Sequence, residues 1–400
     1  MANTPITPVL ADLSQDIAGA IPLELILLWN TSDKSGKKHL ELLSPYEKKG
    51  TVVSSDSAGL SKLSAQLELL DVMQLISQPK EVIHAYGTAI GGRGIGLWVA
   101  DNTQMFYDES ISTQEVIEAM IAAQREIKQL TVQVGMGVHR GTFLEIGGGL
   151  YGEEAENLEE LAENHTAGGE IALTKDVGKY LAREYLKYVK EHSEYPNAYV
   201  LDYASQSPLV RKKTDGSYPY PFNDEFYQFL CRYDQLSKEE RQAHMPKFLQ
   251  RKAVVLMRVY HQRQEQLLEE LTSYIVANAY VNQVHSTFPE LTKVKSNGNL
   301  AIFVSDDPKA AITFAKAVFE KLEHNEFIAN IGITFGDVLL FPMKEGFEIA
   351  GGPVNVASKL AEDSGVQRKI FVEQSVRVDD VHTEPFSFTI SNVEIRGKYL

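Results

Sequence analysis

The chain has 400 residues, of which 44% are hydrophobic and 23% are charged, as in an ordinary globular protein. This length is sufficient for two or three domains that each bury a core. The formal net charge of −15 at pH 7 argues against a nucleic-acid polymer as a partner, because a surface that binds a polyanion is basic. A local basic pocket is still compatible with this charge.

The sequence contains no pattern typical of export or of a membrane span. Residues 1–15 have neither a basic start nor a long apolar run, so they do not resemble a secretory signal. The apolar run at 21–28 is short and contains Glu24, which favours a strand over a membrane span. Cys231 is the only cysteine, so no intrachain disulfide can form, which fits a reducing compartment. We therefore expect a cytoplasmic protein without membrane contact.

The patterns divide the chain into an N-terminal hairpin extension at 1–48, a first domain at 49–205, a linker at 206–250 and a second domain at 251–400. In the extension, two apolar stretches at 22–29 and 39–43 flank polar residues and predict paired strands. The linker begins polar and becomes aromatic, and two short helices are predicted in it, at 224–233 and 238–248. We expect it to pack on the surface of a domain.

The same order of elements is predicted in both domains. In the first domain the elements are a strand at 51–56, a helix that ends near residue 78, a hairpin with arms at 95–100 and 103–107, a helix at 113–129 and a strand at 130–138. In the second domain they are a strand at 253–258, a helix at 262–283, a hairpin at 293–303, a helix at 308–323 and a strand at 328–334. This order is the ferredoxin-like βαββαβ arrangement, so the predicted fold class is α+β with two such domains.

One longer stretch occurs twice and identifies the repeat unit as a whole domain. Each copy, at 136–163 and at 331–362, contains an apolar strand, a turn closed by glycine, a second strand and a helix entered through glycine. In the second copy Gly352 is followed by Val-Asn, a small residue, a basic residue and Leu. This pattern resembles the core of the class III adenylate and guanylate cyclases. The resemblance implies that the two domains pair head to tail within the chain, as a pseudo-dimer with a catalytic site between them.

The first domain carries the residues that match the metal-binding motifs of that family. A strand ends at Asp56, and a turn with Gly59 and Leu60 follows, whose N–H groups at a helix N-terminus can hold a phosphate. Asp101 lies in the predicted hairpin, where the family has its second metal ligand, although Ala100 stands where the family usually has Gly. The resemblance implies two divalent ions, Mg²⁺ or Mn²⁺. Taken singly, each aspartate also suits a turn or a helix cap.

The second domain carries the residues that match the substrate-binding motifs. Asn355 and Lys359 are one helical turn apart and share one face, where the family orients the ribose and stabilises charge at the α-phosphate. The family usually has Arg in place of Lys359, and Arg grips two oxygens whereas Lys is a point charge, which leaves reduced activity open. In the closing strand, Arg396 and Lys398 resemble the basic contact to the triphosphate.

The base is predicted from the pairing of a donor with an acceptor. Adenine offers an acceptor at N1 and an amino donor at N6, whereas guanine N1 is a donor. Lys295 and Glu348 match the adenine-contacting Lys and Asp of family adenylate cyclases, with Glu in place of Asp. Guanine would favour an acidic group at Lys295. Lys295 as a strand-edge residue and Glu348 as a surface residue are the alternative interpretation.

Each domain lacks the groups that the other retains. Arg258 and Asn299 take the places of the two metal-binding aspartates, and Glu156 and Glu160 take the places of the ribose- and phosphate-binding residues. A site built from these four residues would hold no metal pair, and its carboxylates would repel a triphosphate. We therefore expect one working site.

The sequence thus predicts an adenylate cyclase that converts ATP to 3′,5′-cyclic AMP and pyrophosphate. It is expected to act as a monomer with intramolecular domain pairing, and higher oligomers stay open. The alternative is a catalytically silent nucleotide-binding or scaffold protein of the same fold, which Ala100, Glu348 and Lys359 favour. A guanylate cyclase is a weaker third hypothesis.

Overall fold

A computed structural model describes residues 21–59, 63, 66–98, 101–204, 210–212, 216–261, 266–344, 346–362, 364–377, 384–390 and 393–400. The chain forms two compact units. The first unit, as we call it below, is Leu43–Gln235, and the second unit is Leu236–Leu400 together with Ile21–Leu42. The division between them falls inside the stretch expected to be the linker.

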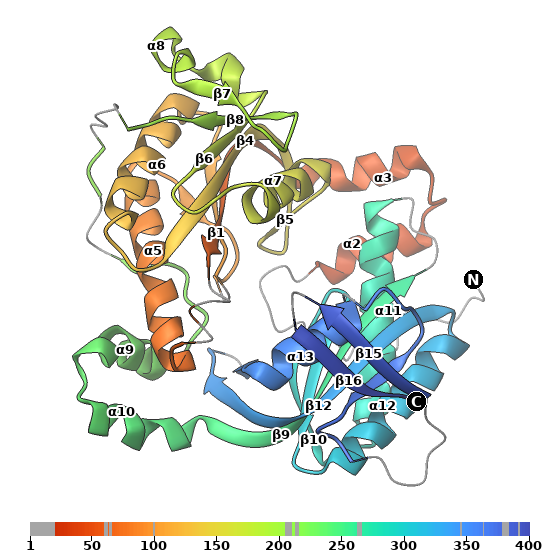
Figure 1. Cartoon of the computed structure of the whole chain (residues 1–400). Helices are drawn as coiled ribbons and strands as arrows, with labels where there is room; N and C mark the ends of the chain where they lie inside the picture. The colour runs from red at the N-terminus through yellow and green to blue at the C-terminus, as the bar shows by residue number, and fades with distance from the viewer. Residues whose placement is uncertain are drawn as a thin grey trace. The chain divides into compact units, whose positions relative to one another are not determined.

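The first unit is an eight-stranded sheet covered by helices. Its elements are η1 (Ser44–Tyr46), β1 (Glu47–Ala58), α5 (Leu69–Ala89), β2 (Arg93–Gly94), β3 (Thr103–Asp108), α6 (Thr113–Ile127), β4 (Gln133–Ile146), β5 (Gly149–Tyr151), α7 (Glu153–Asn164), β6 (Ile171–Thr174), η2 (Val177–Tyr180), α8 (Arg183–Leu186), β7 (Val189–Glu191), β8 (Ala198–Leu201), α9 (Asp224–Arg232) and η3 (Tyr233–Gln235). The strand order is β2-β3-β1-β4-β6-β8-β7, and β5 pairs with β4. Helices α5 and α6 pack together, and α7 packs on β4 and β1 (Figure 1).

The second unit repeats this topology. Its elements are α2 (Leu23–Thr31), α3 (Gly36–Leu43), α10 (Lys238–His244), η4 (Met245–Lys247), β9 (Leu249–His261), α11 (Leu267–His285), β10 (Leu291–Asn297), β11 (Leu300–Ser305), α12 (Pro308–His324), β12 (Phe327–Pro342), β13 (Phe347–Ala350), α13 (Gly352–Glu362), β14 (Ile370–Glu373), β15 (Glu384–Ile390) and β16 (Val393–Tyr399). The strand order is β10-β11-β9-β12-β14-β16-β15, with β13 paired to β12. The prediction of an α+β fold with two βαββαβ domains is confirmed, because both sheets have the ferredoxin-like core order.

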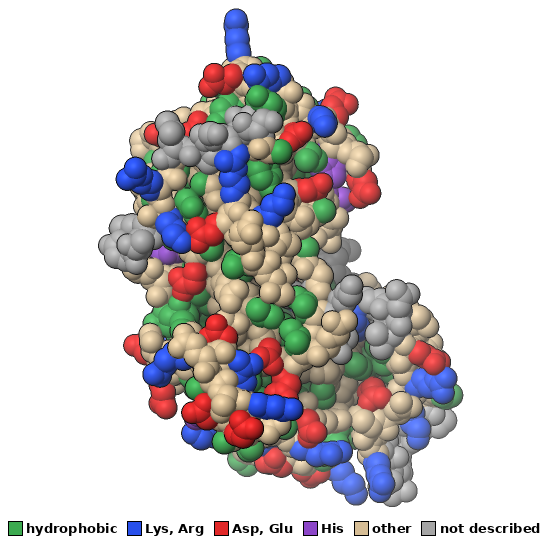
Figure 2. All heavy atoms as spheres, turned by 60° about the vertical axis from the view of Figure 1, so that its left-hand side comes forward, with side chains coloured by type: hydrophobic (Ala, Val, Ile, Leu, Met, Phe, Trp, Pro, Cys, Tyr) green, Lys and Arg blue, Asp and Glu red, His purple; other side chains and the backbone are tan. Residues whose placement is uncertain are grey.

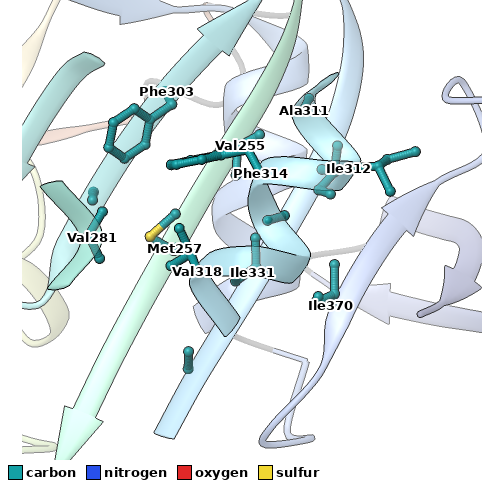
Figure 3. Close-up of a cluster of buried hydrophobic side chains, with 14 of the residues drawn as sticks. Val255, Met257, Val281, Phe303, Ala311, Ile312, Phe314, Val318, Ile331 and Ile370 are labelled. Carbon is teal, nitrogen blue, oxygen red and sulfur yellow. The ribbon is translucent and has the colours of Figure 1, made fainter. Parts of the chain in front are cut away.

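The central strand β9 is buried on both faces, which explains its unbroken apolar run. Val255 and Met257 point to the face covered by α12, and Val254 and Leu256 point to the face covered by α13. Figure 3 shows the first of these clusters, in which Phe314 of α12 lies near Val255. Burying one such side chain contributes about 1.5–3 kcal/mol relative to exposure. The two clusters therefore fix β9 in the middle of its sheet.

The strands continue through the glycines that were expected to close turns. β4 runs through Gly141 and β12 runs through Gly336 without a break, so the prediction of turns there was wrong. At Gly336 an added Cβ would lie 2.9 Å from Cγ of Pro353, near the start of α13. The glycine is needed because a helix begins against the strand, and not because the chain reverses.

The N-terminal hairpin is also a wrong prediction, because residues 23–43 form the helices α2 and α3. An apolar run of this length fits a strand or a buried helix equally well. Leu25, Ile26 and Trp29 have helical spacing and are buried, and α2 packs on α11. The N–H of Leu268 donates to Nε2 of His39 over 3.4 Å.

Two further boundaries differ from the prediction. Helix α5 continues past residue 78 and contains Pro79, and its packing against α6 and α9 outweighs the hydrogen bond that proline removes. The first arm of the hairpin is β2, which lies earlier than the predicted 95–100 and is only two residues long. Leu63 is helical, and its surroundings at 60–62 and 64–65 lie outside the described residues.

The described part of the chain contains no helix with both the length and the apolar character that a membrane crossing requires. Acidic and basic side chains are interspersed over the face shown in Figure 2.

We predict that Gly332→Val destabilises the second unit. An added Cβ at Gly332 would lie 2.3 Å from the carbonyl oxygen of Ala357, so α13 would have to move away from β12. Overpacking of this kind costs about 1–3 kcal/mol. Denaturant unfolding measures the change. Gly352→Ala is the matched control, because nothing lies within 4 Å of its Cβ position, and an equal loss in both variants would contradict the prediction.

Candidate functional site

The structure brings the two predicted metal ligands together in the first unit. Asp56 lies near the end of β1, opposite Gly135 of β4. The hydroxyl of Ser55 is 2.6 Å from that of Thr103, and the hydroxyl of Ser57 donates to the backbone carbonyl of Asp101 over 3.3 Å. These contacts on both sides hold the turn with Asp101 against the strand with Asp56.

The carboxyl groups of Asp56 and Asp101 interact directly. Burial, together with the nearby negative charges of Asp101 and Glu163, raises the pKa of Asp56 to about 7, against a backbone hydrogen bond from Ser57 that lowers it. Two carboxylates held this close stabilise a proton or a cation between them.

This donor set fits Mg²⁺ or Mn²⁺, which bind to oxygen ligands. Among the residues that the structure describes, no three His, Cys, Asp or Glu side chains are grouped to hold an ion by themselves. Mg²⁺ is commonly bound by one or two carboxylates together with phosphate oxygens of a substrate. The pair of aspartates therefore suits ions that arrive with a polyphosphate.

Sequence reasoning missed Glu163, the third carboxylate near Asp56. Nδ2 of Asn102, next to Asp101, donates to Oε1 of Glu163 over 3.3 Å. The repeat offered a signal, because Leu-Ala-Glu occurs near the end of both α7 and α13, as Glu163 and Glu362.

In the second unit a guanidinium group fills the equivalent place. Nε of Arg258 donates to Oε1 of Glu362 over 2.7 Å, and its Nη1 donates to Oδ1 of Asn299 over 2.5 Å. Arg258 lies opposite Asn330 in the sheet, as Asp56 lies opposite Gly135. An internal cation therefore occupies the position of the aspartate pair, and it excludes a divalent ion by repulsion.

The two residues predicted to read the base form an ion pair. Nζ of Lys295 on β10 is 3.3 Å from Oε2 of Glu348 on β13, and their side chains are 21% and 12% exposed. Strand β10 is an edge strand of the sheet, and β13 pairs only with β12, outside the main strand order, yet β10 and β13 contact each other. A donor and an acceptor thus lie side by side in a half-buried position.

The register identifies what replaces this pair in the first unit. Lys295 lies opposite Ile302, and the corresponding place opposite Gln104 belongs to Ile95, whose N–H donates to the Gln104 carbonyl over 2.8 Å. Counting four residues back from Asp101, as Lys295 lies four residues before Asn299, would instead give Leu97, which the register does not place there. Gly149 lies opposite Ile146, at the place that corresponds to Glu348. The first unit therefore has neither a donor nor an acceptor there.

The helices after these strands carry the remaining predicted groups. Asn355 is exposed and Lys359 is half-buried, both on α13. On α7, Glu156 is exposed, and Glu160 contacts His165 over 3.2 Å and Asn164 over 2.8 Å. One helix thus presents an amide and a cation, and its repeat presents two carboxylates.

The predicted phosphate contacts lie at the surface. Gly59 follows β1 with a φ of +78°, a conformation that favours glycine, and Leu60 lies outside the described residues. Arg396 and Lys398 are exposed on β16, and Nε and Nη2 of Arg396 donate to the carboxylate of Glu394 over 2.9 and 2.8 Å. An exposed ion pair of this kind is weak, so a phosphate can replace Glu394 as the partner of Arg396.

No protein-family model and no curated protein matches the sequence. Among solved structures, the chain is similar to a class III adenylyl cyclase-like ATP-binding protein from Pseudomonas aeruginosa, with 15% identity, coverage of 82% of this chain and 84% of that chain, and a TM-score of 0.48. It is similar to the adenylyl cyclase CyaB from P. aeruginosa, with 18% identity, coverage of 41% and 97%, and a TM-score of 0.34. It is also similar to the guanylate cyclase domain of RhGC from Catenaria anguillulae, with 14% identity, coverage of 37% and 94%, and a TM-score of 0.30.

We predict that Asp56→Asn stabilises the metal-free protein at pH 8. The pKa of Asp56 is raised in the folded state to about 7 from an ordinary 3.8, so its contribution to stability is present below pH 4 and is lost as the pH rises through 7. Asparagine does not ionise in the folded state. The melting temperature of the variant should therefore exceed that of the wild type by a few degrees at pH 8, and by less at pH 5.

Asp108→Asn is the control for this measurement. Hydrogen bonds from Ser110 lower the pKa of Asp108, so its charge favours the folded state and its removal should bring no gain at pH 8. An Asp56→Asn variant that melts at the wild-type temperature at both pH values, in EDTA, would contradict the prediction.

Proposed function

We propose that the protein is an adenylate cyclase whose one working site combines the aspartates of the first unit with the nucleotide-binding groups of the second. The observation that carries the proposal is the complementary division of charges. In the first unit, Asp56 and Asp101 lie next to each other. In the second unit, Arg258 and Asn299 form a pair at the equivalent place. Independent decay of two copies would seldom leave one full set of parts split in this way.

The reaction is an intramolecular phosphoryl transfer. The ribose 3′-oxygen forms a bond to the α-phosphorus, the bond from that phosphorus to the bridging oxygen breaks, and pyrophosphate leaves. Divalent ions, when bound, lower the pKa of the 3′-hydroxyl and neutralise the triphosphate. Asp56 and Asp101 would hold these ions through their carboxylate oxygens.

The second unit would bind and orient the nucleotide. Asn355 would hold the ribose through its amide, and Lys359 would stabilise negative charge that develops at the α-phosphate. Arg396 and Lys398 would contact the outer phosphates. Lys359 supplies a point charge and cannot bind two phosphate oxygens at once, as arginine can. A lower turnover than with arginine is therefore expected.

The Lys295–Glu348 pair supports ATP as the substrate. Adenine N1 accepts and its N6 amino group donates, so one edge of the base meets the ammonium and the carboxylate at once. Guanine reverses both groups, which would place N1–H against Lys295 and O6 against Glu348. Each mismatch would leave a buried polar group unpaired, at about 1–3 kcal/mol.

A catalytically silent nucleotide-binding protein is the second candidate, and Lys359 favours it. Incubation of the purified protein with ATP or GTP and Mn²⁺, followed by chromatography for a cyclic product, separates the two. A protein that binds either nucleotide without forming cyclic product would establish the second candidate.

We predict that Asp56→Asn and Asp101→Asn each abolish cyclic AMP formation, by at least about 100-fold, because the loss of either carboxylate removes a ligand from both ions. Arg258→Met is the matched control in the repeat. It breaks the pairs with Glu362 and Asn299 and should lower stability, but turnover of the folded protein should change less than threefold. An equal loss of turnover for Arg258 and Asp56 would reverse the assignment of the two units.

We predict that Lys295→Glu lowers kcat/KM for ATP far more than for GTP. In the wild type, two mismatches of about 1.4 kcal/mol each would favour ATP by roughly a hundredfold. The ratio of kcat/KM for the two nucleotides measures this preference. Lys252→Glu also removes a paired lysine of the second unit, whose Nζ is 2.7 Å from Asp306, and should leave the ratio unchanged. A Lys295→Glu variant with an unaltered ratio would remove this residue from the base pocket.

A further inference from the structure

The stretch expected to be a linker is built into the first unit. Tyr218 and five further aromatic or aliphatic side chains between 218 and 233 are at most 3% exposed, namely Phe222, Phe226, Tyr227, Leu230 and Tyr233. The hydroxyl of Tyr227 donates to Glu81 of α5, and the hydroxyl of Tyr218 donates to Ser77 over 3.2 Å. This segment therefore covers α5 with a closely packed layer, which a flexible spacer would not do.

The same segment holds Trp98, which lies three residues before Asp101. The N–H of Trp98 donates to the carbonyl of Pro219 over 3.0 Å, and its ring stacks on Tyr218 with centroids 5.8 Å apart and planes 16° apart. An added Cβ at Gly94 would lie 2.7 Å from Cγ of Pro219, so β2 also lies directly against this segment.

A buried lysine completes the set of contacts that hold Trp98. Nζ of Lys80 on α5 donates to the carbonyl of Trp98 over 3.0 Å and lies 5.5 Å from the centre of the Tyr218 ring. Lys80 is 1% exposed, and the charge of Asp101 favours its protonated form against the effect of burial. The indole N–H of Trp98 donates to the carbonyl of Ile95 over 3.2 Å, so all three of its polar groups are satisfied.

The contacts around Trp98 restrain Asp101, because only a short length of chain connects the two residues. Three residues span at most about 11 Å between Cα atoms. On its other side Asp101 is held by Ser57 of β1. We propose that the docked segment at Tyr218 and Pro219, with Lys80, positions Asp101 for metal binding, so that residues 216–235 are a working part of the metal-binding half. This inference rests on the proposed function, because it takes Asp101 as a metal ligand.

Tb³⁺ luminescence tests the inference without catalysis. The chain has two tryptophans, so a Trp29→Phe background leaves Trp98 as the only indole that can sensitise a nearby Tb³⁺. Excitation at the red edge of tryptophan absorption and titration with Tb³⁺ give a dissociation constant. Asp101→Asn identifies the part of the emission that depends on this ligand.

In this background Tyr218→Ala should weaken Asp101-dependent Tb³⁺ binding by about 10-fold, the range seen when supporting residues of a metal site are lost. Tyr218→Phe keeps the stacked ring and should bind as the parent does. Tyr280→Ala is the matched control, because Nζ of Lys321 lies 5.2 Å from its ring in the second unit. It should lower stability without changing the dissociation constant. If Tyr218→Ala does not fold, Tyr218→Leu removes the stack and keeps the buried volume.

The outcomes separate this inference from the proposed function. Asp101-dependent emission with the same dissociation constant in Tyr218→Ala would overturn the positioning role and leave the metal site intact. A parent protein without Asp101-dependent emission would overturn the metal site itself, and the inference with it. A lower melting temperature with unchanged Tb³⁺ binding would mean that Tyr218 acts only in folding.

Discussion

In each unit, one central strand is buried on both faces and carries, near its end, the charged residue that distinguishes the two units. β1 ends near Asp56, and β9 reaches Arg258. Because helices cover both faces, a shift in the register of the strand would draw the polar residues at its ends into the core, which is costly. The charged residue at its end is therefore held in place by the core. Aspartate there leaves a pair of carboxylates, for which we propose metal ions, whereas arginine neutralises the charges within the unit.

The two solutions to the same electrostatic problem explain how a duplicated fold can keep one site. A carboxylate pair such as Asp56 and Asp101 is unfavourable until a proton or a metal ion joins it. Arg258 removes this cost permanently by pairing with Glu362 and Asn299. The second unit thereby gains stability at a place where it needs no metal. The first unit keeps the cost because the proposed chemistry needs the ions.

The sequence predicted the parts of the structure that depend on periodic burial. Both βαββαβ units follow from apolar strands and amphipathic helices, and α12 begins at the predicted Pro308. The N-terminal helices were missed because the apolar run from Leu23 to Trp29 fits either element, and only packing on α11 decides between them. The contact between Lys295 and Glu348 was foreseen only through a family resemblance, since no local pattern connects residues 53 positions apart. Glu163 was missed although the repeated Leu-Ala-Glu near the ends of α7 and α13 carried a signal for it.

The aromatic segment shows most clearly what composition cannot predict. Residues 216–235 have Pro and Gly at their start, which is typical of a linker, and their aromatic side chains predict packing on a domain surface without indicating which surface. The structure gives them one, because Lys80 and Glu81 on α5 bind this segment through Tyr218 and Tyr227. Lys80 is buried and Glu81 is half-buried, and removing charged groups from water is costly unless each has a partner. The docking is therefore specific, since an undocked segment would remove the Tyr218 ring from Lys80 and the Tyr227 hydroxyl from Glu81, and would uncover Trp98. A stretch that connects two units thus also packs against Trp98, three residues before Asp101.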